Sequence, residues 1–238
     1  MSLIGQLQYL LHTRPELSYY VNKLKRHTTK TRIIHWQAAQ HVLAYVNGTL
    51  DMRLVFCNNG DQAVTLTPQF FSDADYAQNA ETRKSITGVT VNLAGASILA
   101  RSIQQPTVAD STLAAEVIAL HSIVKDAIWV RHMLEWMGFL QHQPSIIWCD
   151  NRGAVFNCED GGLRSKTKHL DIKYMFIREM VRQNLIKIKH IPTDQMIADI
   201  LTKHLGWIKF TKYASALGLM KGSVLETSDV INHAEERS

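Results

Sequence analysis

Four carboxylates in this sequence stand at the ends of apolar runs or within helical patterns: Asp73, Glu116, Asp150 and Asp199. Burying an acid beside the end of a sheet costs several kcal/mol unless a cation neutralises it. Each acid taken alone is better explained as a helix cap, a turn residue or half of an ion pair. Together they form a set of oxygen ligands, which suits Mg²⁺ or Mn²⁺ and phosphate chemistry. Two such ions about 4 Å apart activate a water and stabilise a leaving oxygen.

The apolar periodicity predicts the strands and helices that would position these acids. We expect an α/β domain in the order β-β-β-α-β-α-β-α, with a sheet that starts as an antiparallel meander. Asp75 is expected just past the end of its strand as a turn residue, and it is the second choice as a ligand. The predicted strands are 66–72, 87–93, 97–102, 145–149 and 186–191, and the predicted helices are 113–137, 172–182 and 194–205.

The first part of the chain differs from the rest in pattern and in charge. Apolar residues recur every three or four positions from residue 3 to 47, which predicts helices. Residues 1–59 carry seven bases and two acids (7 − 2 = +5), whereas the remainder has 19 of each sign. This asymmetry favours contact with a polyanion, although a solvated helix face explains it equally well. The turn-rich segment CNNGDQ predicts a boundary between a helical segment, 1–59, and a domain, 60–221, followed by a disordered tail, 222–238.

Composition excludes several classes of protein. The 238 residues are 46% hydrophobic and 20% charged, as in ordinary globular proteins. Three cysteines without a CxxC pair supply neither a disulfide framework nor a four-cysteine zinc site. The sequence has no membrane-spanning apolar run and no basic start like that of a signal peptide. We therefore expect a cytoplasmic protein without a membrane partner.

Five motifs along this chain resemble motifs that occur in the same order in the ribonuclease H domain of copia-type LTR retrotransposon Pol polyproteins. Their counterparts in that family are SDADWAG…RKSTSG, AEYIAL, CDNQ, RTKHIDIRYHFIRE and DQLADILTKPL. Residues 2–24 and 35–56 resemble the end of the reverse transcriptase that precedes this domain, so the resemblance covers about residues 2–220. The motifs in this chain are SDADYAQNAETRKSITG (72–88), AEVIAL (115–120), WCDN (148–151), KTKHLDIKYMFIRE (166–179) and TDQMIADILTKHL (193–205).

The resemblance implies a ribonuclease H-like fold, a mixed five-stranded sheet with flanking helices, preceded by a small helical segment. It implies hydrolysis of the RNA strand of RNA/DNA hybrids with two Mg²⁺ or Mn²⁺ ions, and a location that extends to virus-like particles. The hybrid and the remainder of a reverse transcriptase are the expected partners. The catalytic residues and metal ligands carried over from the family are Asp73, Glu116, Asp150 and Asp199.

A basic stretch is the predicted place of substrate contact. Residues 164–189 hold eight bases and two acids, which is a plausible phosphate track. His190 stands near the position of a histidine that assists product release in cellular ribonucleases H. We favour a strand-end histidine bonded to the backbone there. The residues expected to bind substrate are Asn151, Lys166, Lys168 and His169.

Two other functions remain open from the sequence. Departures from the family pattern leave room for a catalytically unused module that binds nucleic acid or docks onto a polymerase. Another nuclease or an integrase on the same fold is the weaker alternative. Polymerase activity is excluded, because the sequence has no adjacent Asp-Asp pair and we expect no palm region before residue 1. The departures are Ala100, Leu113, Val117 and Met175.

Overall fold

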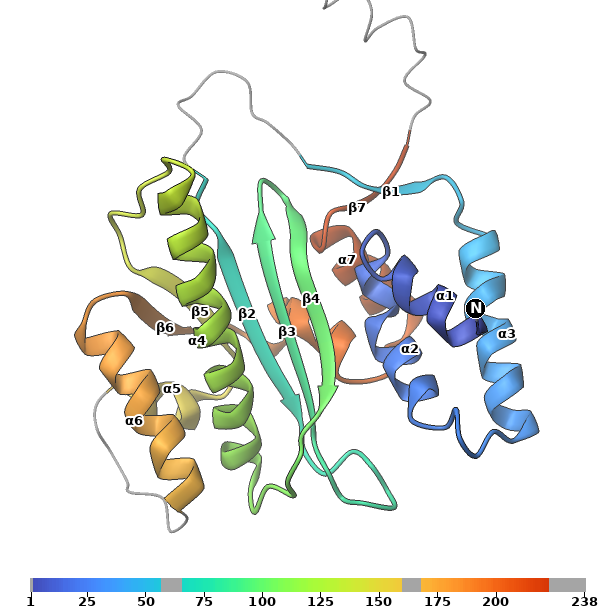
Figure 1. Cartoon of the computed structure of the whole chain (residues 1–238), viewed down its shortest axis with the longest axis horizontal. Coiled ribbons are helices and arrows are strands. Elements are labelled where there is room, and N and C mark those ends of the chain that lie inside the picture. Colours follow the sequence, from blue (N-terminus) through green and yellow to red (C-terminus); the bar gives the residue numbers. More distant parts are fainter. Residues whose placement is uncertain (1, 57–65, 160–167, 223–238) are drawn as a thin grey trace, which may run out of the picture.

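A mixed five-stranded sheet forms the centre of the molecule (Figure 1). The computed structural model describes residues 2–56, 66–159 and 168–222. In the strand order β4-β3-β2-β5-β6, β2 pairs antiparallel with β3 and β3 with β4, whereas β2–β5 and β5–β6 are parallel. The strands are β2 (Gln69–Asp75), β3 (Ile86–Leu93), β4 (Ala96–Gln104), β5 (Ser145–Cys149) and β6 (Ile186–His190).

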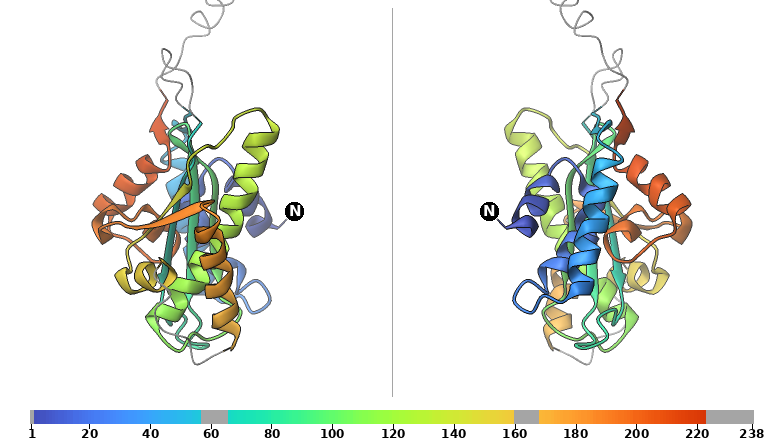
Figure 2. Two further views of the ribbon diagram at one scale, coloured as in Figure 1. Left: turned by 90° about the vertical axis from the view of Figure 1, so that its left-hand side faces the viewer. Right: turned by 90° about the vertical axis from the view of Figure 1, so that its right-hand side faces the viewer.

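Helices cover both faces of this sheet, as the edge-on views show (Figure 2). Successive residues of β2 point to opposite faces. Phe70 packs into the core beneath α4, α5 and α6, whereas Phe71 packs into a second core beneath η3 and α7. The covering elements are α4 (Thr112–Trp136), α5 (Arg152–Glu159) and α6 (Lys168–Arg182) on the first side, and η2 (Thr193–Gln195), η3 (Ile197–Leu201) and α7 (Trp207–Ala216) on the second.

The helical segment at the N-terminus packs beside β4 and η3. It has a small core of its own, to which α1, α2 and α3 each contribute apolar side chains. A two-stranded antiparallel sheet, which the sequence did not predict, joins β1 to β7 near the two ends of the described chain. The elements are α1 (Leu3–Leu10), η1 (Pro15–Leu17), α2 (Ser18–Lys25), α3 (Ile33–Asn47), β1 (Met52–Leu54) and β7 (Leu219–Lys221).

Two details of the predicted domain are wrong. Asp75 does not lie past the strand end, because β3 pairs with β2 through the register Asp75↔Ile86. The helix predicted over 194–205 is two short 3-10 turns instead. Buried Met196, with extended backbone (ψ 92°), separates them, because its side chain packs into the second core. The predicted boundary at 57–62 and the tail after residue 222 lie outside the described residues. Within the described ranges, no helix is both long and apolar enough to cross a membrane.

Candidate metal centre

Asp73 and Asp150 come together because β2 and β5 are neighbouring parallel strands. Ser72 pairs with Cys149, and an aspartate follows on each strand. Asp73 is buried, with 3% of its surface exposed. Asp150 is half-buried, and its Oδ2 accepts a hydrogen bond from Thr193 Oγ1 at 2.9 Å. The parallel ladder therefore fixes two carboxylates side by side.

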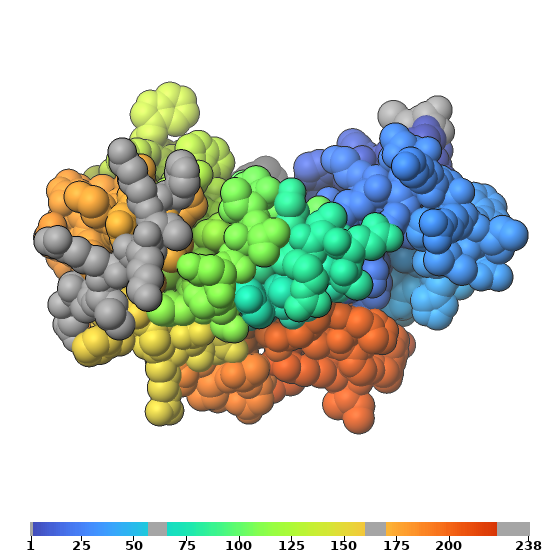
Figure 3. All heavy atoms as spheres, turned by 90° about the horizontal axis from the view of Figure 1, so that it is seen from below, coloured from blue at the N-terminus to red at the C-terminus, as the bar shows by residue number. Residues whose placement is uncertain are grey.

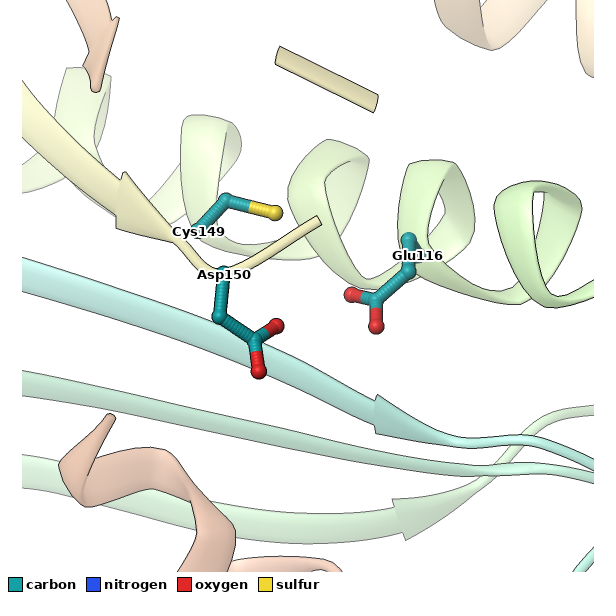
Figure 4. A group of neighbouring side chains, drawn as sticks. All are labelled: Glu116, Cys149 and Asp150. Atoms are coloured by element: carbon teal, nitrogen blue, oxygen red, sulfur yellow. The ribbon is translucent and has the colours of Figure 1, made fainter. Parts of the chain in front are cut away.

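Glu116 reaches the same place from α4. This helix begins behind Ser111, whose hydroxyl accepts a hydrogen bond from the Ala114 amide at 3.1 Å. Glu116 lies in the second turn and is 3% exposed. Its carboxylate projects from the helix toward that of Asp150 (Figure 4). The backbone amide of Ala74 lowers the pKa of this carboxyl, against the larger effect of burial, and Glu116 Oε2 has no hydrogen-bond partner among the described residues.

Asp199 lies on η3, and Gly88 allows η3 to pack closely against the sheet. Gly88 pairs with Asp73 across β2 and β3. A Cβ atom at Gly88 would lie 2.6 Å from Thr202 Cγ2 and 2.8 Å from the carbonyl oxygen of Ala198. The missing side chain therefore lets η3 lie directly on the strand beside Asp73. Thr202 Oγ1 then donates a hydrogen bond to Asp73, and Asp199 is fully buried.

The structure brings the four predicted acids together as two overlapping groups. Asp73, Asp150 and Asp199 each offer a carboxylate oxygen, and these atoms lie within 4.8 Å of one another. Glu116, Cys149 and Asp150 form the second group within the same limit. Burial raises the pKa of the Cys149 thiol, and the charge of Glu116 raises it further, so the sulfur stays protonated. The arrangement therefore offers oxygen ligands to a hard divalent cation.

No family model matches this sequence. It is 33% identical over 219 residues to the retrovirus-related Pol polyprotein from transposon RE2 of Arabidopsis thaliana, and 32% identical over 219 residues to that from transposon TNT 1-94 of Nicotiana tabacum. Each alignment covers 92% of this chain. The chain belongs to the retrovirus-related Pol polyprotein family. It spans 15% of the length of the first relative and 16% of the second.

The strand order and directions of the sheet in this Pol-family chain agree with the predicted fold. The prediction, an α/β ribonuclease H-like fold with a mixed five-stranded sheet after a helical segment, is confirmed. The N-terminal RNase H domain of Rv2228c from Mycobacterium tuberculosis, solved as a fusion with maltose-binding protein, is 14% identical. It aligns with 63% of this chain and 98% of that one, with a TM-score of 0.44.

Burial and mutual repulsion disfavour the ionised acids of this Pol-family site. The pKa of Asp73 is raised to about 7, chiefly by burial and further by the charges of Asp199 and Asp150, which together outweigh the opposing charge of Lys203. Burial raises the pKa of Glu116 well above its usual range, and the charges of Asp73 and Asp150 add to it. A bound cation would relieve both effects.

Two lysines already neutralise part of the cluster. Lys203 Nζ lies 2.8 Å from Asp199 Oδ1 and 3.7 Å from Asp73 Oδ2. Lys209 Nζ lies 2.6 Å from Asp199 Oδ2. Burial lowers the pKa of Lys203, but the surrounding carboxylates outweigh it and the net shift is upward. Each oxygen of Asp199 therefore lies within ion-pair distance of an ammonium group, and Oδ2 also accepts a hydrogen bond from Lys209.

Asp75, the second-choice ligand, is half-buried on the same face of β2 as Asp73. Burial raises its pKa, Lys203 lowers it, and Asp199 raises it again, so Asp75 lies within the field of the cluster. It belongs to neither of the two groups of close ligand atoms.

The residues predicted to bind substrate are only partly described. The Asn151 side-chain oxygen accepts a hydrogen bond from the Ala154 amide at 3.0 Å and so caps α5. Lys166 lies outside the described residues, as do the side chains of Lys168 and His169. His190 is the last residue of β6 and pairs with Cys149 in the parallel ladder. Substrate contact by these residues stays a prediction.

Sequence reasoning missed the groups that surround the acids. Lys203 follows Asp199 at the i, i+4 spacing of an ion pair, which was a usable signal. Lys209 stands ten residues after Asp199, and no local pattern links them. Gly88 is the last residue of the motif at 72–88, but its role can be seen only in three dimensions, where η3 packs closely against it.

Proposed function

We propose that this chain hydrolyses the RNA strand of RNA/DNA hybrids, using divalent metal ions held by its four clustered acids. The observation that carries the proposal is the convergence of Asp73, Asp150 and Asp199, whose ligand oxygens lie within 4.8 Å of one another. Membership of the Pol family and the ribonuclease H-like sheet support the same reaction class. A nuclease of this class uses its protein chiefly to position metal and phosphate.

The residues present fit Mg²⁺ or Mn²⁺. Glu116 Oε2 is buried and unpartnered, which is costly unless a ligand completes its coordination. The donors are carboxylate oxygens, the type that both ions prefer. Ions held there would activate a water and stabilise the leaving oxygen. The proposed ligands are Asp73, Glu116, Asp150 and Asp199.

Side chains of the protein would orient the attacking water and hold two of the acids in place. Glu116 Oε2 would accept a hydrogen bond from the attacking water, because no donor among the described residues occupies it. Thr193 holds Asp150 in one orientation through its hydroxyl. Thr202 does the same for Asp73. These neutral donors fix two acids without removing their negative charge.

We propose that the basic stretch, residues 164–189, and its neighbours recognise the hybrid. The 2′-hydroxyl and the shape of the hybrid distinguish it from duplex DNA. If Lys166 and Lys168 each contact a phosphate, replacing both with alanine should flatten the salt dependence of binding by about two units of slope. Asn151 and His169 are the other proposed contacts. The location proposed for the protein is the cytoplasm, including virus-like particles.

The test is cleavage of an end-labelled RNA strand in a hybrid, followed on a gel with Mn²⁺ or Mg²⁺ and with EDTA as control. Matched duplex DNA and single-stranded RNA serve as competing substrates. We expect metal-dependent cuts in the hybrid RNA only. Equal cleavage of duplex DNA would place the chain in another nuclease class.

A second function, docking onto a polymerase with the acids unused, is favoured by one feature of the surface. Helix α3 exposes large apolar side chains that a free helical segment would not be expected to present. The side chains are Ile33 (77% exposed), Ile34 (61%), Trp36 (52%) and Leu43 (38%). This module would bind hybrid or a reverse transcriptase body, and it would fail to cut hybrid with either metal.

A further inference from the structure

The two groups of the acidic cluster differ in what neutralises them. Lys203 and Lys209 form ion pairs with Asp199, and Lys203 also lies 3.7 Å from Asp73. Among the side chains that the structure describes, neither Glu116 nor Asp150 forms an ion pair with a lysine or an arginine. Within the described part of the chain, lysines therefore neutralise one half of the cluster and leave the other without a cation.

The position of Lys203 is set by the fold. It follows Asp199 by four residues and lies two residues past the end of η3, and the close approach of η3 at Gly88 brings both residues to the face that carries Asp73. Its side chain is 35% exposed, so the ammonium lies at the rim of the site with a route to solvent. Asp199, in contrast, is completely buried and cannot turn away.

A divalent ion bound between Asp73 and Asp199 would compete with this ammonium. Both would need the same carboxylate oxygens, and two positive charges a few ångströms apart repel each other. Among the described side chains no such competitor lies beside Glu116, whose Oε2 lacks a partner there. The same acids thus offer one open site and one site that already holds a cation.

We propose that Lys203 is the resident cation of the Asp73–Asp199 half, so that the chain binds one divalent ion tightly at the Glu116–Asp150 half. The second ion binds only when the Lys203 ammonium moves aside, and its affinity is correspondingly weaker. This inference rests on the proposed metal site and specifies how its two positions differ. Lys203 acts here as a specificity-determining residue for metal number.

The test counts bound Mn²⁺ by isothermal titration and by the loss of free-ion EPR signal, with no substrate present. Lys203→Met removes the charge but keeps most of the side-chain volume. We expect one tight ion for wild type, and in the variant a second ion whose affinity rises about tenfold or more. Lys203→Arg keeps the charge and should resemble wild type.

The matched control is Lys212→Met. Lys212 lies on α7, but its Nζ donates to the backbone carbonyl of Asp194 at 2.8 Å and not to a carboxylate. This control should bind metal as wild type does. If it gains the second ion to the same extent, a general change of surface charge explains the result and the role of Lys203 is overturned.

Two wild-type results also decide the matter, so the proposal does not depend on the variant folding. Two equally tight ions in wild type would overturn the role of Lys203 while leaving the proposed nuclease site intact. No Mn²⁺ binding at all would overturn both. Unchanged metal number and affinity in a folded Lys203→Met, checked by circular dichroism, would contradict the role of Lys203 alone.

Discussion

The two halves of the acidic cluster carry the same kind of side chain but are built differently. Glu116 lies near the start of a long helix and Asp150 directly after strand β5, and neither forms an ion pair with a lysine or arginine among the described side chains. Asp199 comes from a short 3-10 turn and has an ammonium group on each oxygen. Glu116 thus has no cationic partner among the described side chains, whereas Asp199 is stabilised by two ion pairs.

This difference indicates which acid serves ligand binding and which stabilises the folded state. An acid without a cationic partner in the protein is costly to the folded state and useful only when a ligand arrives. An acid paired with lysines contributes to the folded state in the absence of any ligand. Substitutions of Glu116 and of Asp199 should therefore have opposite effects on stability, and the following variants test that contrast.

The largest effect is expected for Glu116→Gln. Loss of a proposed ligand and water-orienting oxygen should lower the rate of hybrid cleavage about a thousandfold, or about 4 kcal/mol. The free energy of unfolding in EDTA should stay the same or rise, because a neutral amide replaces a buried charge that burial and two carboxylates disfavour. Cleavage assays and urea denaturation measure the two quantities. A clear loss of stability would show that Glu116 is structural.

Asp199→Asn should act in the opposite direction on stability. It removes the partner of Lys203 and Lys209, whose side chains are 35% and 37% exposed and can reach water. We expect the free energy of unfolding in EDTA to fall by about 1–3 kcal/mol. Urea denaturation at neutral pH gives the value. An increase in stability would mean that the burial cost of Asp199 exceeds the benefit of its ion pairs.

Gly88→Ala tests how the second half is held against the sheet. The added Cβ would meet the backbone oxygen of Ala198 and the side chain of Thr202, so η3 must shift. We expect a loss of about 1–3 kcal/mol in unfolding free energy. Gly48→Ala is the control, because its φ is −76° and the nearest atom to an added Cβ lies at an ordinary 3.4 Å. Equal effects of the two substitutions would argue against close packing at Gly88.

The smallest effect is expected at the junction with the N-terminal helices. Tyr20, on α2, lies with its hydroxyl 3.0 Å from His204 Nδ1, next to Lys203 in sequence. Figure 3 views the molecule from below and shows the N-terminal helices (blue) beside the C-terminal part of the described chain (orange to red). Tyr20→Phe should cost about 0.5–1.5 kcal/mol in thermal or urea unfolding. No change at all would show that this contact does not couple the segment to the site.

Much of the sheet could be predicted because its strands are short apolar runs with clear ends. The strand at Ser145–Cys149 was predicted with its observed bounds, and the long helix was placed within one residue at each end (Thr112–Trp136). The acids at the ends of such runs were candidates for the same reason. A period of two or of 3.6 is a local property, and the sequence displays it directly.

The surroundings of the acids depend on contacts between distant residues, and no local pattern encodes them. Met196 interrupts the predicted last helix because its side chain packs into the second core, so tertiary packing and not local sequence determines the backbone there. Lys209 reaches Asp199 only because α7 turns back along η3. Helix α5 and strands β1 and β7 were missed because each is short and weakly patterned.

The most direct test of a metal-dependent hybrid nuclease compares wild type with Asp150→Asn, in one experiment that measures both hybrid binding and hybrid cleavage in Mn²⁺. Asp150 is half-buried and has no lysine or arginine partner among the described side chains, so its replacement should leave the fold intact. We predict that wild type cuts the RNA strand, whereas Asp150→Asn binds the hybrid at least as tightly and does not cut. Tight binding by both proteins with cleavage by neither would contradict the nuclease function and favour the docking module.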